Sequence, residues 1–151
     1  MNLTSNNAIT IAFSFLIIIQ VYFYMADILH TSLDYFVSIL AILISLLLLL
    51  FDNNKLFDVA HFLYCVLYLF VVTLFSQNLY LLTLNAIMLV VIIASRVYYQ
   101  NCILNIKQNN QGFFVNLNDT VKKYLLFWDW DYIFPVLLFI TTVKLTKLGD
   151  F

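Results

Sequence analysis

The chain has 151 residues, of which 64% are hydrophobic and 10% are charged, and its formal net charge is −1. About a quarter of the residues of an average soluble domain are charged, so this composition excludes an ordinary water-soluble domain. Because Lys and Arg do not outnumber Asp and Glu, the composition also excludes a basic surface for binding nucleic acid. Two Gly and one Pro are too few for a barrel of many strands and turns, and the apolar runs are continuous rather than alternating. We therefore predict an all-α integral membrane helical bundle, because helices satisfy their own backbone in lipid.

Four closely connected transmembrane helices are predicted in residues 1–98, over residues 9–26, 35–51, 56–75 and 79–98. Each is close to the roughly 20 apolar residues that cross a hydrocarbon core about 30 Å thick. Residues 59–95 contain no Asp, Glu, Lys or Arg, and only the triplet Ser76-Gln77-Asn78 interrupts them with polar side chains. This triplet predicts a tight turn between the third and fourth spans. The short connections predict an up-and-down antiparallel bundle.

The chain changes character after the fourth span. Residues 99–131 hold most of the Asn and Gln and predict a polar extramembrane loop. A fifth transmembrane helix and the C-terminus occupy residues 132–151, with Pro135 in the first turn, where a missing N–H costs little. Trp128, Trp130 and Tyr132 are the expected interface anchors. The alternative is a helix that lies in the membrane interface instead of crossing it.

Five spans would place the N-terminus and the long loop on one membrane side and the C-terminus on the other. Lys and Arg are more numerous on the N-terminal side, which favours the matrix or cytoplasm for that side. The basic residues are Lys55, Arg96, Lys107, Lys122 and Lys123 on the N-terminal side, and Lys144 and Lys147 opposite. The bias toward Phe, Tyr, Leu, Ile and Asn indicates an AT-rich organellar or viral genome. The polar, uncharged N-terminus lacks the pattern of a secretory or mitochondrial leader.

One helix face could offer metal ligands. Asp58, His61 and Cys65 are spaced i, i+3, i+7 in the third span, and Cys102 follows the fourth span on the same membrane side. His61, Cys65 and Cys102 are therefore weak candidates for a metal site or a redox centre. A buried Cys that acts as a small hydrophobe, and a His that pairs near a helix start, is the more ordinary interpretation. We predict no catalytic residue, no resident metal and no cofactor.

Polar side chains inside the membrane are the other candidates, because their burial is costly. Gln20 and Asn85 are the principal ones, and Ser45, Thr73 and Thr83 accompany them. An intramembrane amide more often joins helices by hydrogen bonds than binds a ligand, so we expect Asn85 to hold helices together. The group Asp27, His30 and Asp34 in the first connection is expected to be a solvated turn rather than a proton-entry site.

The segment Leu67-Tyr68-Leu69-Phe70-Val71-Val72 resembles the Leu-Phe-Leu-Phe-Val-Val segment in the third membrane helix of subunit 6 of mitochondrial NADH:ubiquinone oxidoreductase, respiratory complex I. The layout of four connected helices, a long loop and a fifth helix is also similar to that family. In the family a Tyr-Val-Gly-type stretch precedes the segment and permits a π-bulge, whereas the corresponding positions here are Ala60, His61 and Phe62. Without that glycine, the conformational role of the family does not carry over to this chain.

The resemblance implies a divergent membrane-arm subunit of complex I, which would pack against other hydrophobic membrane subunits and help couple quinone reduction to proton translocation. We accordingly expect a small, multi-pass, non-catalytic subunit of an energy-transducing complex in the mitochondrial inner membrane. Its partners would be the lipid bilayer and neighbouring hydrophobic subunits, and not nucleic acid. One alternative is a structural accessory subunit of another respiratory complex or of ATP synthase. Another is a viral or endomembrane structural membrane protein.

Overall fold

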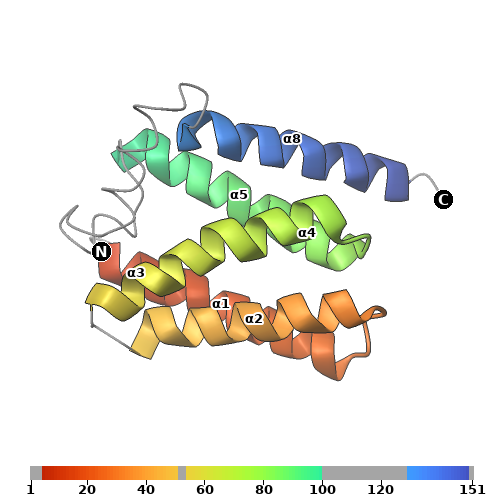
Figure 1. The fold of residues 1–151 in the computed structure, drawn as a ribbon, viewed down its shortest axis with the longest axis horizontal. Coiled ribbons are helices and arrows are strands. Elements are labelled where there is room, and N and C mark those ends of the chain that lie inside the picture. The colour runs from red at the N-terminus through yellow and green to blue at the C-terminus, as the bar shows by residue number, and fades with distance from the viewer. Residues whose placement is uncertain (1–4, 51–53, 100–128, 150–151) are drawn as a thin grey trace.

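The computed structural model describes residues 5–50, 54–99 and 129–149 (Figure 1). All regular structure in these residues is helical, which confirms the predicted all-α class. The elements are α1 (Ser5–Met25), α2 (Ser32–Leu50), α3 (Asn54–Phe62), the π-helix η1 (Leu63–Leu69), α4 (Phe70–Phe75), α5 (Leu79–Tyr99) and α8 (Trp130–Gly149). Most of the predicted polar loop falls outside the described residues.

The elements α3, η1 and α4 follow one another without a break and form one rod, residues 54–75, which we call the central helix. It lies between the pair α1 and α2 on one side and the pair α5 and α8 on the other (Figure 1). Its first half contacts α2, and its last segment, α4, contacts α5 and α8. Successive helices run in opposite directions, which is the predicted up-and-down arrangement.

The two ends of the bundle differ in what they hold. The N-terminal side holds the start of α1, the end of α5 and the start of α8 (Figure 1). The C-terminal side holds the connection 26–31, the turn 76–78 and the end of α8. The turn at Ser76-Gln77-Asn78 is confirmed, because α4 ends at Phe75 and α5 begins at Leu79.

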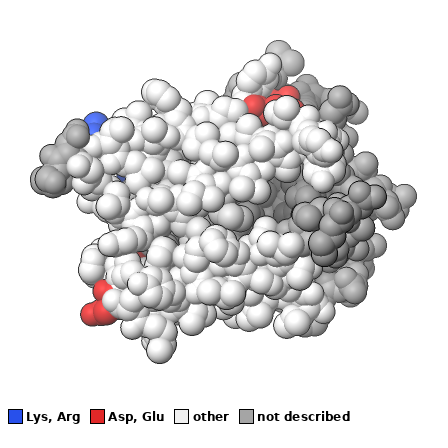
Figure 2. Space-filling view, turned by 180° about the vertical axis from the view of Figure 1, so that it is seen from behind, with Lys and Arg blue, Asp and Glu red and all other residues white. Residues whose placement is uncertain are grey.

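Within the described ranges, three helices are long and apolar enough to cross a membrane: α2, α5 and α8. Residues 10–25 and 59–75 form shorter apolar helices. Large apolar side chains are exposed along the outer faces of the bundle, for example Met25, Phe75 and Phe139. Figure 2 shows charged atoms only near the two ends of one face, with an uncharged band between them. These features support a membrane protein.

The π-helix η1 keeps one face of the central helix buried along its whole length. Buried positions recur there every four residues, at Phe57, His61, Cys65, Leu69 and Thr73. In an α-helix each step of four residues overshoots a full turn by about 40°, so this row would wind around the rod. The wider i→i+5 turns of a π-helix compensate for that drift. The glycine that precedes the π-bulge in the resembled family is therefore not needed for a π-helix here.

Two boundaries differ from the sequence expectation. Helix α8 begins at Trp130, so Pro135 lies in the second turn and not the first. The carbonyl of Asp131 consequently lacks the i+4 N–H donor that any other residue would supply. Helix α1 begins at Ser5 and ends at Met25 rather than covering residues 9–26. Two residues after its end, Asp27 is left-handed (φ 52°), and the N–H of Ile28 donates to the carbonyl of Phe23 (3.1 Å), as in a Schellman C-cap.

Candidate functional site

A cluster of three polar side chains joins α4, α5 and α8 in the interior. The Asn85 Nδ2 atom donates to Thr73 Oγ1 (2.8 Å) and to Thr141 Oγ1 (3.4 Å), and the two hydroxyl oxygens lie 3.2 Å apart. All three side chains are fully buried. The Asn85 Oδ1 atom receives no hydrogen bond from any described residue. The cluster links three helices that the sequence separates by 68 positions, as expected of an intramembrane amide.

Thr141 is the member of this cluster that the sequence did not single out. Its hydroxyl also donates to the carbonyl of Leu137 (2.8 Å), four residues earlier, which is the usual acceptor for the hydroxyl of a Thr inside a helix. Thr83, by contrast, was singled out from the sequence but is not part of this cluster. It is exposed, and within the described ranges its hydroxyl bonds only to the carbonyl of Leu79 in its own helix (2.8 Å), so it does not belong to the interior polar cluster.

A second buried contact joins α1 to the π-helix. The Gln20 Nε2 atom donates to the Tyr68 hydroxyl (2.9 Å), and both side chains are fully buried. The Tyr68 ring stacks on Tyr64 (5.5 Å between centroids), and the edge of Phe13 meets Tyr64 (5.3 Å). The Gln20 Oε1 atom has no partner among the described residues. The predicted intramembrane residues Gln20 and Asn85 thus each face the core with an amide oxygen that nothing described satisfies.

Asp34 is buried, contrary to the expectation of a solvated turn. It forms a capping box with Thr31: its Oδ2 accepts from the Thr31 N–H (3.1 Å), and its own N–H donates to Thr31 Oγ1 (3.1 Å). The other oxygen, Oδ1, accepts from the Ser76 hydroxyl (3.3 Å). Asp27 and His30 are exposed, as expected. Asp34 is buried because its carboxylate satisfies donors from two connections at once.

Asn78 and Lys144 complete the ties on the C-terminal side. The Asn78 side chain caps α5 by accepting from the N–H groups of Tyr80 (3.0 Å) and Leu81 (3.2 Å), and its Nδ2 donates to the carbonyl of Ile28 (2.8 Å). The Lys144 ammonium does not extend into solvent as a snorkelling lysine would. It turns inward, to carbonyls at the end of α4. The connection 26–31, the turn 76–78 and α8 are therefore held together by side chains.

The metal-ligand candidates are only partly placed by the structure. His61 and Cys65 are both buried on the central helix, and Cys102 lies outside the described residues. Among the residues that the structure describes, no group of three or more His, Cys, Asp or Glu side chains could hold a metal ion.

The expected interface anchors also differ from one another. Trp130 is buried, with its ring stacked on Phe134 (5.2 Å) and edge-on to Phe70 (6.4 Å). Tyr132 is exposed, and Trp128 lies outside the described residues. Trp130 thus contributes to the packing of α8 on α4, while an anchoring role for these aromatic residues stays a prediction.

The buried polar groups form a column along the central helix. In chain order His61, Tyr64, Tyr68 and Thr73 are buried on this rod, and Ser76 is buried directly after it. Residues 61–76 cover roughly 20 Å at about 1.5 Å per residue. Gln20, Asn85, Thr141 and Asp34 add polar atoms to the column from other helices. The chain matches no family model, no curated protein and no solved structure.

Proposed function

We propose that this chain is a small multi-pass membrane subunit of an energy-transducing complex of the mitochondrial inner membrane, specifically a divergent membrane-arm subunit of respiratory complex I. All five long helical rods would cross the bilayer, with the N-terminal side facing the matrix. The subunit would have no catalytic residue of its own. Its work would be to pack against neighbouring subunits and to take part in proton coupling.

The position of the π-helix carries this proposal. The segment that resembles subunit 6, residues 67–72, begins inside η1 and continues into α4. In the resembled family the stretch that precedes this segment permits a π-bulge, and here η1 begins at Leu63, directly after the corresponding positions 60–62, although the family's glycine is missing. A π-helix is rare and is frequently found at functional sites, so its coincidence with the resembling segment supports a shared role.

The polar column supports the coupling part of the proposal. Tyr68 lies within η1 and receives the hydrogen bond of Gln20, so a change from π to α geometry would move the phenol relative to α1. Buried amide oxygens of Gln20 and Asn85 without a described partner are the kind of groups that ordered water satisfies. A line of such groups through an apolar bundle supports a water path that works together with ionisable groups of neighbouring subunits.

The exposed apolar surface supports the structural alternative as well. Phe, Tyr and Leu side chains cover the outer faces of the helices, and packing against other subunits requires no active site. A structural accessory subunit of another respiratory complex or of ATP synthase would use the same surface. A viral or endomembrane structural protein would use it against lipid or against copies of itself.

Native electrophoresis distinguishes these functions. Membranes from cells that express the epitope-tagged full chain are solubilised in mild detergent, and the complexes are separated, stained for NADH dehydrogenase activity and identified by mass spectrometry. We expect the tag in the band that reduces dye with NADH, together with complex I subunits. A tag that migrates with ATP synthase, with another respiratory complex or without respiratory subunits contradicts the proposal.

A further inference from the structure

A cleft lies where α5 ends and α8 begins, on the N-terminal side of the bundle. Its volume is about 370 Å³. It is lined by Ile93, Arg96, Val97, Trp130, Asp131, Phe134 and Pro135. Most of these side chains are apolar, and the two charged ones belong to different helices. The cleft therefore combines an apolar wall with a pair of opposite charges at the end of two long apolar helices.

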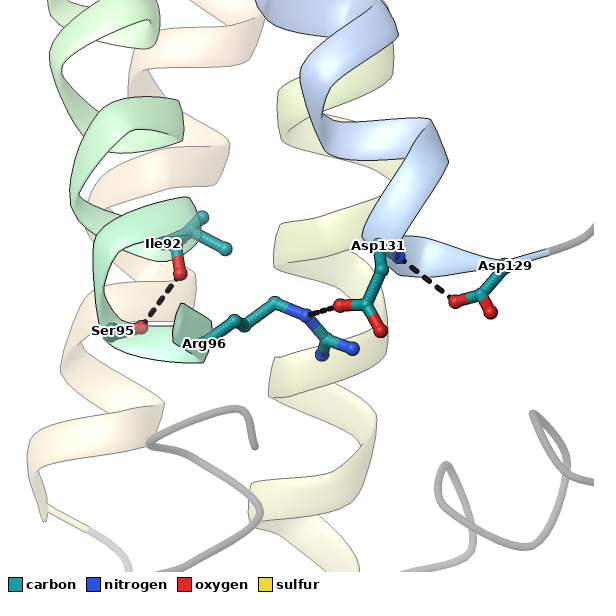
Figure 3. A network of polar contacts seen from close by, with 5 residues as sticks. All are labelled: Ile92, Ser95, Arg96, Asp129 and Asp131. Carbon is teal, nitrogen blue, oxygen red and sulfur yellow. Dashed lines mark hydrogen bonds and ion pairs between the residues drawn. The ribbon is translucent and has the colours of Figure 1, made fainter. Parts of the chain in front are cut away.

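Among the residues that the structure describes, Arg96 forms hydrogen bonds only through the Nε atom of its guanidinium. Its Nε atom donates to Asp131 Oδ1 at 2.6 Å, and the group lies over the Phe134 ring, 5.9 Å from the centroid (Figure 3). Only the contact from Nε joins the guanidinium to Asp131 (Figure 3), and no described residue accepts a hydrogen bond from the two terminal nitrogens. The Arg96 side chain is only 16% exposed. A largely buried guanidinium with both terminal amino groups unused is suited to bind a phosphate by two parallel hydrogen bonds.

Asp131 presents the complementary charge beside this fork. Its Oδ1 accepts from Arg96, while its Oδ2 has no partner among the described residues, and the side chain is 59% exposed. The site as a whole is neutral, because the ion pair cancels its own charge. A simple anion would therefore bind to Arg96 against the repulsion of an adjacent carboxylate.

We propose that this cleft binds the headgroup of a phospholipid that carries a primary ammonium, as in phosphatidylethanolamine. The phosphodiester accepts hydrogen bonds from the terminal nitrogens of Arg96, and the ammonium donates to Asp131 Oδ2. The glycerol and the first part of an acyl chain lie along Ile93, Val97 and Pro135. A choline headgroup has no N–H to donate to Asp131, and a glycerol headgroup brings a negative charge without the ammonium, so both fit less well.

This inference requires only that α5 and α8 lie in lipid, and it is independent of membership in complex I. The test uses the purified, delipidated full chain in detergent, incubated with equimolar dioleoyl phosphatidylethanolamine, phosphatidylcholine and phosphatidylglycerol. Native mass spectrometry measures the bound lipids. We expect the ethanolamine lipid to dominate the first adduct, and inorganic phosphate in excess not to displace it. Equal adducts of the three lipids, a preference for phosphatidylglycerol, or displacement by phosphate overturns the proposal.

Two variants separate the two contacts. Arg96→Gln removes the phosphate donors and should weaken the ethanolamine lipid about tenfold or more, with partial recovery in Arg96→Lys, because a hydrogen bond to a charged group is lost. Asp131→Asn keeps the shape of the site and should abolish the preference of ethanolamine over choline while binding persists. Lys147→Gln, an exposed cation near the opposite end of α8, is the matched control and should change nothing. A preference that survives in Asp131→Asn, in protein of unchanged helical circular dichroism, contradicts the assignment.

Discussion

The ammonium of Lys144, on α8, donates to the carbonyl oxygen of Ser76, at the end of α4, over 2.6 Å. It also donates to the carbonyls of Thr73 (3.0 Å) and Leu74 (3.2 Å). The last carbonyls of a helix have no partner within it, and the C-terminal end of the helix dipole attracts a cation. A residue from α8 thus caps α4, which joins the last helix to the turn 76–78.

Replacing this lysine with an apolar side chain of similar length should destabilise the bundle. We expect Lys144→Met to lower the free energy of unfolding by about 1.5–3 kcal/mol, the range for hydrogen bonds to a charged group. Lys147→Met, at an exposed position one turn further along α8, should have an effect below about 0.5 kcal/mol. Denaturation in mixed micelles, followed by circular dichroism, measures both. Equal effects of the two changes would show that the cap contributes no stability.

Asp34 should contribute more to the free energy of unfolding than its capping partner, Thr31. Thr31→Ala removes one side of the capping box and should cost about 1 kcal/mol. Asp34→Ala removes the acceptor for the N–H groups of His30 and Thr31 and for the Ser76 hydroxyl, so we expect about 2–3 kcal/mol.

The control for this pair is Thr142→Ala. Thr142 is exposed, and its hydroxyl bonds to no described residue except Leu138 in its own helix, whose carbonyl accepts from it. The loss of this hydroxyl should therefore be nearly neutral. The same micelle denaturation applies to all three variants. A cost for Thr31→Ala equal to or above that for Asp34→Ala would mean that the contact from Asp34 to Ser76 adds nothing.

The interior cluster predicts a measurable coupling between α4 and α5. In a double-mutant cycle of Asn85→Ala and Thr73→Val, we expect an interaction free energy of about 0.5–1.7 kcal/mol, since hydrogen bonds between membrane helices lie in this range. The cycle of Asn85→Ala with Thr83→Val is the control, because Thr83 bonds within its own helix and lies away from the core. Coupling as large in the control cycle would be incompatible with a direct contact between Asn85 and Thr73.

The all-helical class and the order of the helices followed from hydropathy, because continuous apolar runs of span length leave only helices as a solution. The turn at Ser76-Gln77-Asn78 was equally readable, since three polar residues interrupt a long uncharged stretch. Gln20 and Asn85 could be singled out because an amide in an apolar helix is costly unless it is bonded. Their partners could not, because pairing depends on which helix faces which.

Two of the features that sequence reasoning missed arise from contacts between distant segments. Asp34 looked like a surface residue because the chain around it is polar, and its burial comes from Ser76, 42 positions away. From the sequence, Lys144 was only one of two basic residues expected on the C-terminal side, while its acceptors lie at the end of α4. The π-helix had no local signal such as a glycine. Only the four-residue spacing of Phe57, His61, Cys65, Leu69 and Thr73 could have indicated it.

The contact between Gln20 and Tyr68 tests whether η1 is stabilised by α1. Tyr68→Phe leaves the Gln20 amide buried without its acceptor, and we expect a loss of about 1–2 kcal/mol of unfolding free energy. Adding Gln20→Leu should restore part of that loss, because replacing both partners with apolar groups leaves no unsatisfied amide. Tyr80→Phe is the matched control, as Tyr80 is exposed on α5.

The same variants test the coupling role if the chain assembles into complex I as proposed. In membrane vesicles that contain the assembled complex, Tyr68→Phe should lower the number of protons moved per NADH oxidised while the rate of NADH oxidation stays within about twofold, because the phenol lies among the buried polar groups of the central helix. Tyr80→Phe should leave both quantities unchanged. A purely structural contact would instead lower the amount of assembled complex and both rates in proportion, leaving their ratio constant.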